Sequence, residues 1–152
     1  MQFIKETIIN ATPEKVFEFH LQPDAFELLS PPWETVKVIQ KADITKIGSQ
    51  AIIETKIFGI IPARWVAEHT KFDPPKMFED IQLSGPFRSW RHKHIVLPHE
   101  NGAILRDEIE FEPPFGFLGV PFAPFLVTPK LEKMFEYRHQ VTKKWCEESE
   151  NV

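Results

Sequence analysis

Two histidines and an aspartate lie where a β-strand pattern sends apolar and charged side chains to opposite faces. In residues 87–97 and 103–112, apolar positions alternate with charged ones, as in half-buried strands. His92 and His94 share the less charged side of the first segment, and Asp107 shares that of the second. Because the charged sides face water, we expect these three residues inside the protein. An imidazole beside a carboxylate can move a proton or orient a bound ligand.

Further residues join this candidate site. Arg138 interrupts an apolar helical stripe, where its guanidinium is expected to point inward and pair with Asp80, with Asp107 or with a ligand's carboxylate. Phe78 and Asp80 share one side of the segment 77–84, but both sides carry apolar residues, so the inward side stays open. A tryptophan precedes the histidines on their side of the strand. The expected ligand-binding residues are Phe78, Asp80, Trp90, His92, His94, Asp107 and Arg138.

The histidine pair also has the spacing of metal ligands, with Asp107 as the candidate third ligand. His-x-His on a strand is common and nonspecific, so we expect no metal and no cofactor. A buried polar network without a catalytic role is an equal alternative to a functional site. Neither a nucleophile elbow, a phosphate-binding loop nor a dinucleotide fingerprint occurs in the sequence.

These residues require an antiparallel sheet to bring them together. After a strand at 3–10, Thr12-Pro13 has the pattern of a helix start, and a second short helix is expected at 24–29. Short turns then separate six strands, and Asn101-Gly102 is typical of a hairpin. Depending on the loop length, Asp107 falls diagonal to His94 or directly opposite it. The six strands are expected at 35–41, 50–58, 63–72, 77–84, 87–97 and 103–112.

The chain ends in a predicted amphipathic helix from Lys130 to Glu147, preceded by Thr128-Pro129 as its cap and first turn. With 14 Phe and one Tyr in the chain, we expect the sheet and this helix to enclose a cavity lined by Phe and Trp. The Pro-rich stretch at 114–125 is expected to be either a flexible apolar lid or a loop packed on the end of the sheet. The apolar stripe of the helix contains Leu131, Met134, Phe135, Arg138, Val141 and Trp145.

Composition limits the class of protein. The 152 residues suit one domain, residues 1–152, and the net charge of −4 with no basic face argues against nucleic-acid binding. The single cysteine, Cys146, excludes an internal disulfide and is interpreted as an unremarkable thiol in a polar terminal stretch. No apolar run approaches the length of a membrane span, and charges come too early for a signal peptide, so we expect a cytoplasmic protein.

The order of elements and several local motifs resemble the START-like (SRPBCC) superfamily, which includes polyketide cyclases and lipid-transfer domains. The resemblance covers nearly the whole chain and implies a helix-grip fold in the α+β class: about seven curved antiparallel strands around a long C-terminal helix, with an internal hydrophobic cavity. Pro121, Pro124 and Pro129 depart from the more continuous helix expected there, so a different lid is implied. The motifs are Ala11-Thr12-Pro13-Glu14-Lys15-Val16-Phe17, Phe78, Asp80, Gln82, Gly85-Pro86-Phe87, Trp90, His92, His94, Asp107, Pro113-Pro114, Gly116, Leu118-Gly119, Phe135 and Arg138.

Three functions follow as hypotheses, since a fold alone does not assign one. The first is a binding or carrier protein for a hydrophobic or aromatic small molecule, oriented by the polar cluster. The second is a cyclase or dehydratase in which His92 or His94 is the general base and Asp107 orients it. The third is a regulatory module that binds other proteins, which a collapsed interior would favour.

Overall fold

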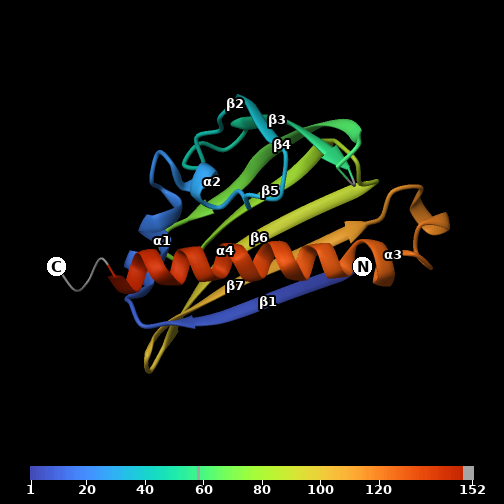
Figure 1. Cartoon of the computed structure of the whole chain (residues 1–152). Coiled ribbons are helices and arrows are strands. Elements are labelled where there is room, and N and C mark those ends of the chain that lie inside the picture. Colours follow the sequence, from blue (N-terminus) through green and yellow to red (C-terminus); the bar gives the residue numbers. More distant parts are fainter. Residues whose placement is uncertain (58, 149–152) are drawn as a thin grey trace.

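The computed structural model describes residues 1–57 and 59–148, and within them one curved antiparallel sheet of seven strands dominates (Figure 1). The strand order is β1-β7-β6-β5-β4-β3-β2. Strands β2 to β7 thus form a meander, as short turns predict, and β1 pairs with β7. The strands are β1 Gln2–Ile9, β2 Val36–Gln40, β3 Gln50–Ile57, β4 Ile61–Asp73, β5 Met77–Ser84, β6 Ser89–His99 and β7 Gly102–Glu112.

All seven expected strands are present, with ends that differ by a few residues. The expected end of one strand at Phe58 lies outside the described residues. Strand β6 begins at Ser89, later than predicted. The side chain of Gln82 binds the backbone just before β6: its Nε2 donates to Phe87 O at 2.7 Å, and Phe87 N donates to its Oε1 at 3.3 Å. These bonds hold the residues before β6 in a turn.

The β6–β7 hairpin sets the register of the site. His99 pairs with Gly102, which places His94 directly opposite Asp107, one of the two registers that the sequence allows. Gly102 has a φ of 131°, and a Cβ built there would lie 2.4 Å from the backbone oxygen of Ile9. A larger residue would therefore disturb both this turn and the end of β1.

One long helix, α4 (Thr128–Glu148), lies across the curved sheet, and two short helices, α1 (Pro13–His20) and α2 (Ala25–Leu28), follow β1 (Figure 1). The Thr12 hydroxyl accepts a hydrogen bond of 3.2 Å from the backbone N–H of Lys15, which confirms the predicted helix start. This arrangement confirms the helix-grip prediction. No helix in the described part of the chain is both long and apolar enough to cross a bilayer.

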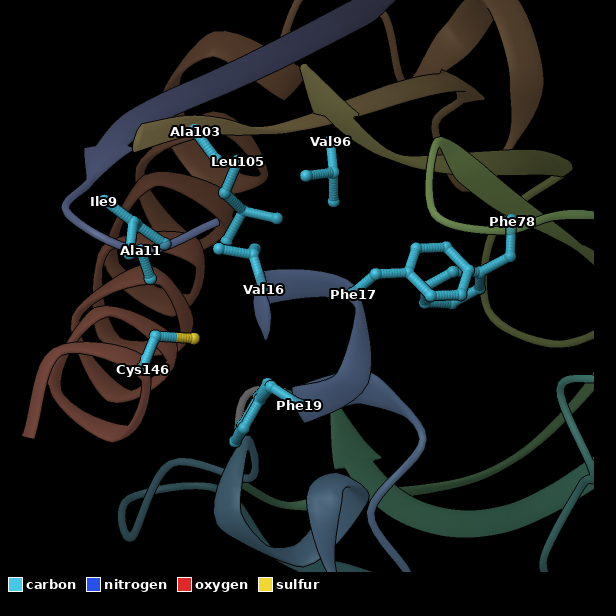
Figure 2. Packing of buried hydrophobic residues seen from close by; sticks show 10 residues of the cluster. All are labelled: Ile9, Ala11, Val16, Phe17, Phe19, Phe78, Val96, Ala103, Leu105 and Cys146. Atoms are coloured by element: carbon cyan, nitrogen blue, oxygen red, sulfur yellow. The ribbon is translucent and has the colours of Figure 1, made fainter. Parts of the chain in front are cut away.

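The core between sheet, α1 and α4 is apolar and rich in phenylalanine (Figure 2). Cys146 belongs to it with no exposed surface, so its interpretation as a thiol in a polar stretch was wrong. Of the predicted stripe of α4, Leu131 and Phe135 are buried, whereas Met134, Arg138, Val141 and Trp145 are half-buried. The buried face is rotated from the predicted stripe and consists of Leu131, Phe135, His139, Thr142 and Cys146.

The Pro-rich segment forms a short 3-10 helix, Gly116–Leu118, and the short helix α3, Ala123–Leu126. Its phenylalanines do not pack on the end of the sheet, contrary to one of the two expectations. Phe115 and Phe117 are 84% and 80% exposed, and Phe122 and Phe125 are also exposed. Their rings present apolar surface to solvent at this end of the molecule.

Candidate functional site

Strands β5, β6 and β7 bring four predicted polar residues together. Asp80 stands opposite His92 across the β5–β6 pair, and His94 stands opposite Asp107 across the β6–β7 pair. His94 Nε2 lies 3.1 Å from Asp80 Oδ2, and His94 Nδ1 lies 3.2 Å from Asp107 Oδ1. The side chain of Asp80 thus points inward, which resolves the ambiguity in the sequence pattern.

Asp107 is the centre of the cluster. Its Oδ1 accepts a hydrogen bond of 2.7 Å from His92 Nε2, and its Oδ2 accepts one of 2.7 Å from His139 Nε2 on α4. The other ring nitrogen of His139 lies 2.8 Å from the Thr7 hydroxyl, which can donate to it when the ring is neutral. The carboxylate therefore joins the sheet to the long helix through buried hydrogen bonds.

Both carboxylates are ionised in the folded protein. Burial acts to raise the pKa of Asp107, but hydrogen bonds from His139, His92 and His94 outweigh burial and hold the pKa well below its usual value. At Asp80, burial again acts to raise the pKa. The hydrogen bond from His94 and the nearby charge of His92 outweigh burial, so the pKa of Asp80 is lowered. The site thus holds two negative charges out of bulk water.

The imidazoles titrate differently although they are neighbours. Burial acts to lower the pKa of His94, yet the hydrogen bonds with Asp107 and Asp80 raise it to about 9. Burial and the nearby His94 lower the pKa of His92, and the same two causes lower that of His20 to about 4. In this arrangement the raised pKa favours the protonated form of His94, and the lowered pKa favours the neutral form of His92, so of the two histidines His92 has the state that a general base requires.

Aromatic rings fix the histidines. Phe78 stacks on His94 with ring centroids 4.0 Å apart, and His92 lies on the other side of His94 at 3.7 Å. Trp90 is 6.3 Å from His92, within an aromatic group that includes Phe87. Both predicted aromatic residues therefore border the cluster, and Trp90 does so from its edge.

Arg138 lies apart from this ion-pair network. Its Nε donates a hydrogen bond of 3.3 Å to the backbone oxygen of Leu29, and its guanidinium lies 5.2 Å from the centre of the Phe135 ring. Within residues 1–57 and 59–148, no carboxylate is within 4.0 Å of it, so the predicted ion pair with Asp80 or Asp107 is wrong. Burial lowers the pKa of its guanidinium below the usual value.

A small pocket lies between α4, α1 and the sheet. Its volume of about 10 Å³ holds a single water molecule at most, and six of its nine lining residues are polar. The expected cavity lined by Phe and Trp is therefore not open in this structure, and a closed interior is the observation that was expected to favour the regulatory module that binds other proteins. Leu29 and Phe135 are among the apolar side chains that line the remaining space. The lining residues are His20, Leu29, His94, Leu105, Asp107, Phe135, Arg138, His139 and Thr142.

A larger hollow of about 370 Å³ lies along β2, β3 and β4, but it shares no lining residue with the pocket beneath α4. Lys37, Lys56 and Arg64 line it, and Glu54 binds Arg64 at 3.0 Å. This hollow has solvated ion pairs rather than a buried cluster, so the pocket beneath α4 is the stronger candidate site.

Sequence reasoning missed His139 and His20 as members of the site. His139 has no exposed surface, and it stands four residues after Phe135 on the buried face of α4. The four-residue spacing from Phe135 was the sequence signal that could have placed His139 on the buried face of the helix. His20 shares a helix face with Val16, and its Nδ1 donates to Val16 O at 3.0 Å, because a carbonyl oxygen only accepts.

Three kinds of chemistry are compatible with this arrangement. The guanidinium of Arg138 can bind an anion at the pocket, and protonated His94 can donate a proton or a hydrogen bond. The ligand atoms of Asp80, His92 and His94 lie within 4.8 Å of one another, close enough to hold one metal ion.

Comparisons with known proteins agree with the fold. Protein CV1439 from Chromobacterium violaceum has a TM-score of 0.71 and 15% identity, covering 96% of this chain and 97% of its own. The protein TTHA0849 from Thermus thermophilus has a TM-score of 0.68 and 16% identity, covering 93% and 97%. A nucleoside-diphosphate sugar epimerase from Corynebacterium glutamicum has a TM-score of 0.66 and 22% identity over 93% of this chain but 28% of its own. At these identities the likeness is one of fold.

Among curated proteins, none has a sequence that matches this chain. The model of one family, described as polyketide cyclase / dehydrase and lipid transport, matches residues 9–135. That range includes the strands β2 to β7, α1 and most of the polar cluster. The chain therefore belongs to the polyketide cyclase/dehydrase and lipid transport family.

Proposed function

We propose that this protein binds a hydrophobic or aromatic small molecule that carries an acidic group, with Arg138 as the anchor for that group. One observation carries the proposal: the Arg138 guanidinium borders the buried pocket, and no carboxylate of residues 1–57 or 59–148 lies within 4.0 Å of it. Arg138 is half-buried, and its Nε donates to the backbone oxygen of Leu29, so a ligand carboxylate would supply the counter-ion that none of the described residues provides.

The apolar part of such a ligand can lie against the aromatic residues next to the pocket. Phe135 borders both the polar pocket and a second apolar cluster that contains Trp90 and Phe111. Trp65 and Phe87 pack at the edge of that cluster and are half-buried. An aromatic or aliphatic body can extend from the pocket along these rings, provided that the side chains closing the 10 Å³ pocket move aside.

The test compares acids with neutral analogues of the same shape. We would titrate the protein with 2-naphthoate and 2-naphthamide, and with dodecanoate and dodecanol, following tryptophan fluorescence and isothermal calorimetry. Wild-type protein should bind the acid of at least one pair about 10-fold or more tightly than the neutral analogue, because a charge-assisted hydrogen bond contributes about 1.5–3 kcal/mol.

Arg138→Met should abolish the preference for the acid while keeping the fold, checked by circular dichroism. Arg91→Met is the matched control, because Arg91 is exposed on the outer side of β6. The proposal fails if none of the four probes binds, or if Arg138→Met prefers acids as strongly as wild type does.

A further inference from the structure

The two imidazoles of β6 bridge two buried carboxylates. On one side, His92 Nε2 and His94 Nδ1 lie 2.7 and 3.2 Å from the same oxygen of Asp107. On the other side, His92 Nδ1 and His94 Nε2 lie 3.9 and 3.1 Å from the same oxygen of Asp80. Each ring therefore presents one nitrogen to Asp107 and the other to Asp80.

Protons hold this arrangement together when no metal is bound. His92 Nε2 donates a hydrogen bond of 2.7 Å to Asp107, and His94 Nε2 donates one of 3.1 Å to Asp80, because a carboxylate only accepts. A neutral His92 then has its lone pair on Nδ1, 3.9 Å from the same oxygen of Asp80. A metal ion that displaces the proton of His94 Nε2 would find both imidazole nitrogens and the carboxylate oxygen around it.

The distances suit a metal ion. Zinc binds imidazole nitrogen and carboxylate oxygen at about 2.0–2.2 Å, so ligand atoms in a tetrahedral site lie about 3.3–3.5 Å apart. The observed separations of 3.1 and 3.9 Å lie on either side of this value, and all three ligand atoms fall within 4.8 Å of one another. Two histidines and one carboxylate leave a fourth position for water or another ligand.

Asp107 has the place of an outer-shell partner. Histidines that bind metals typically donate their other N–H to a carboxylate, which fixes the tautomer and strengthens the ligand. Asp107 accepts from both rings and is held in turn by His139 at 2.7 Å. From the sequence, Asp107 itself is the candidate third ligand and no metal is expected. The structure instead puts Asp80 at the ligand position and Asp107 behind the histidines.

Charge and access are also suitable. Asp80 and Asp107 together balance a divalent cation, and the side chains of Asp80 and His94 are 15% and 14% exposed, which leaves a route from solvent. His69, opposite Asp80 on β4, has a buried Nδ1 with no hydrogen-bond partner among the described residues. We propose that Asp80, His92 and His94 bind one divalent transition-metal ion of the Zn²⁺ type.

The experiment is calorimetric titration of chelator-treated protein with Zn²⁺, Co²⁺ and Mg²⁺. Zn²⁺ and Co²⁺ should bind with about one ion per chain and raise Tm, whereas Mg²⁺, which prefers oxygen ligands, should not. Asp80→Asn keeps the size of the side chain and should weaken Zn²⁺ binding by more than about 10-fold. If Asp80→Asn fails to fold, His94→Gln provides the second test of the same ligand set.

His99→Gln is the matched control, because His99 lies on β6 beyond the site and should leave Zn²⁺ affinity unchanged. Equal Zn²⁺ affinity in wild type and Asp80→Asn, or no Zn²⁺ binding by chelator-treated wild type, would overturn the proposal. Arg138→Met should bind Zn²⁺ as wild type does. Failure of the acid-binding proposal would therefore leave the metal site intact, and failure of the metal site would leave acid binding intact.

Discussion

Replacing the central carboxylate is the most direct test of the buried network. In Asp107→Asn the side chain keeps its shape but loses its charge, and its amide has one oxygen acceptor and one N–H donor group where the carboxylate has two acceptors. Only one of His92 and His139 then keeps an acceptor, the other meets an N–H group, and protonated His94 loses one of its two counter-ions. His139 can change tautomer and donate to Thr7 instead, which recovers part of the loss.

Breaking a buried ion pair by removing one partner costs about 3–5 kcal/mol. Because His139 can adapt, we expect the lower half of that range for Asp107→Asn in metal-free protein. For a chain of this size, each kcal/mol lowers Tm by about 2–4 °C. Urea unfolding followed by circular dichroism at neutral pH would measure the change in the free energy of unfolding.

Glu110→Gln is the matched control on the same strand. It makes the same carboxylate-to-amide change at an exposed position, where the nearest cation, on Lys93, is 3.9 Å away. Such surface pairs contribute about 0–1 kcal/mol. If Asp107→Asn costs no more than Glu110→Gln, Asp107 is not the centre of a stabilising network.

Two further predictions concern pH and packing. In chelator-treated protein, the pKa of His94 rises on folding from 6.5 to about 9. Its contribution to stability is therefore complete below pH 6.5 and is lost as pH rises through about 9. The free energy of unfolding, measured by urea titration, should fall over this pH interval, and it should fall less in His94→Phe. Phe19→Ala should lower the free energy of unfolding by about 3–5 kcal/mol, because Phe19 is fully buried. Phe117→Ala, at an 80% exposed position, should change it by no more than about 0.5 kcal/mol in the same assay. Equal losses in the two variants would contradict the assignment of the core.

Strand alternation predicted the inner faces of β6 and β7 because charged residues mark their outer faces. The same reasoning left the inner side of β5 open, because Met77, Ile81 and Leu83 put apolar residues on its outer side as well. Glu79, next to Asp80, is only 2% exposed and accepts a hydrogen bond of 2.8 Å from the Thr70 hydroxyl. With at least one apolar residue and one acidic residue on each side of β5, the sequence has no contrast that identifies the inner face.

The helix shows a second limit of such reasoning. A search for apolar residues selects Met134 and Trp145, whereas the face that is buried contains His139 and Thr142. Polar members of a buried network look like surface residues in a hydrophobicity pattern, although their partners on the sheet satisfy them. The pocket volume could not be predicted from the sequence either, because it depends on how Leu29 and other side chains pack rather than on the period of a strand or helix.

The same contacts indicate which wall of the pocket must move when a ligand enters. The α4 wall is fixed to the sheet through the buried hydrogen bond of His139 with Asp107. The opposite wall is the segment after α2, where the backbone oxygen of Leu29 accepts a 3.3 Å hydrogen bond from Arg138 and Trp33, 45% exposed, lies against Tyr137. A ligand carboxylate is a stronger acceptor for a guanidinium than a neutral backbone oxygen. If an acid binds as proposed, it would exchange the Leu29 contact for a charged one, and opening of this segment would both free Arg138 and widen the pocket.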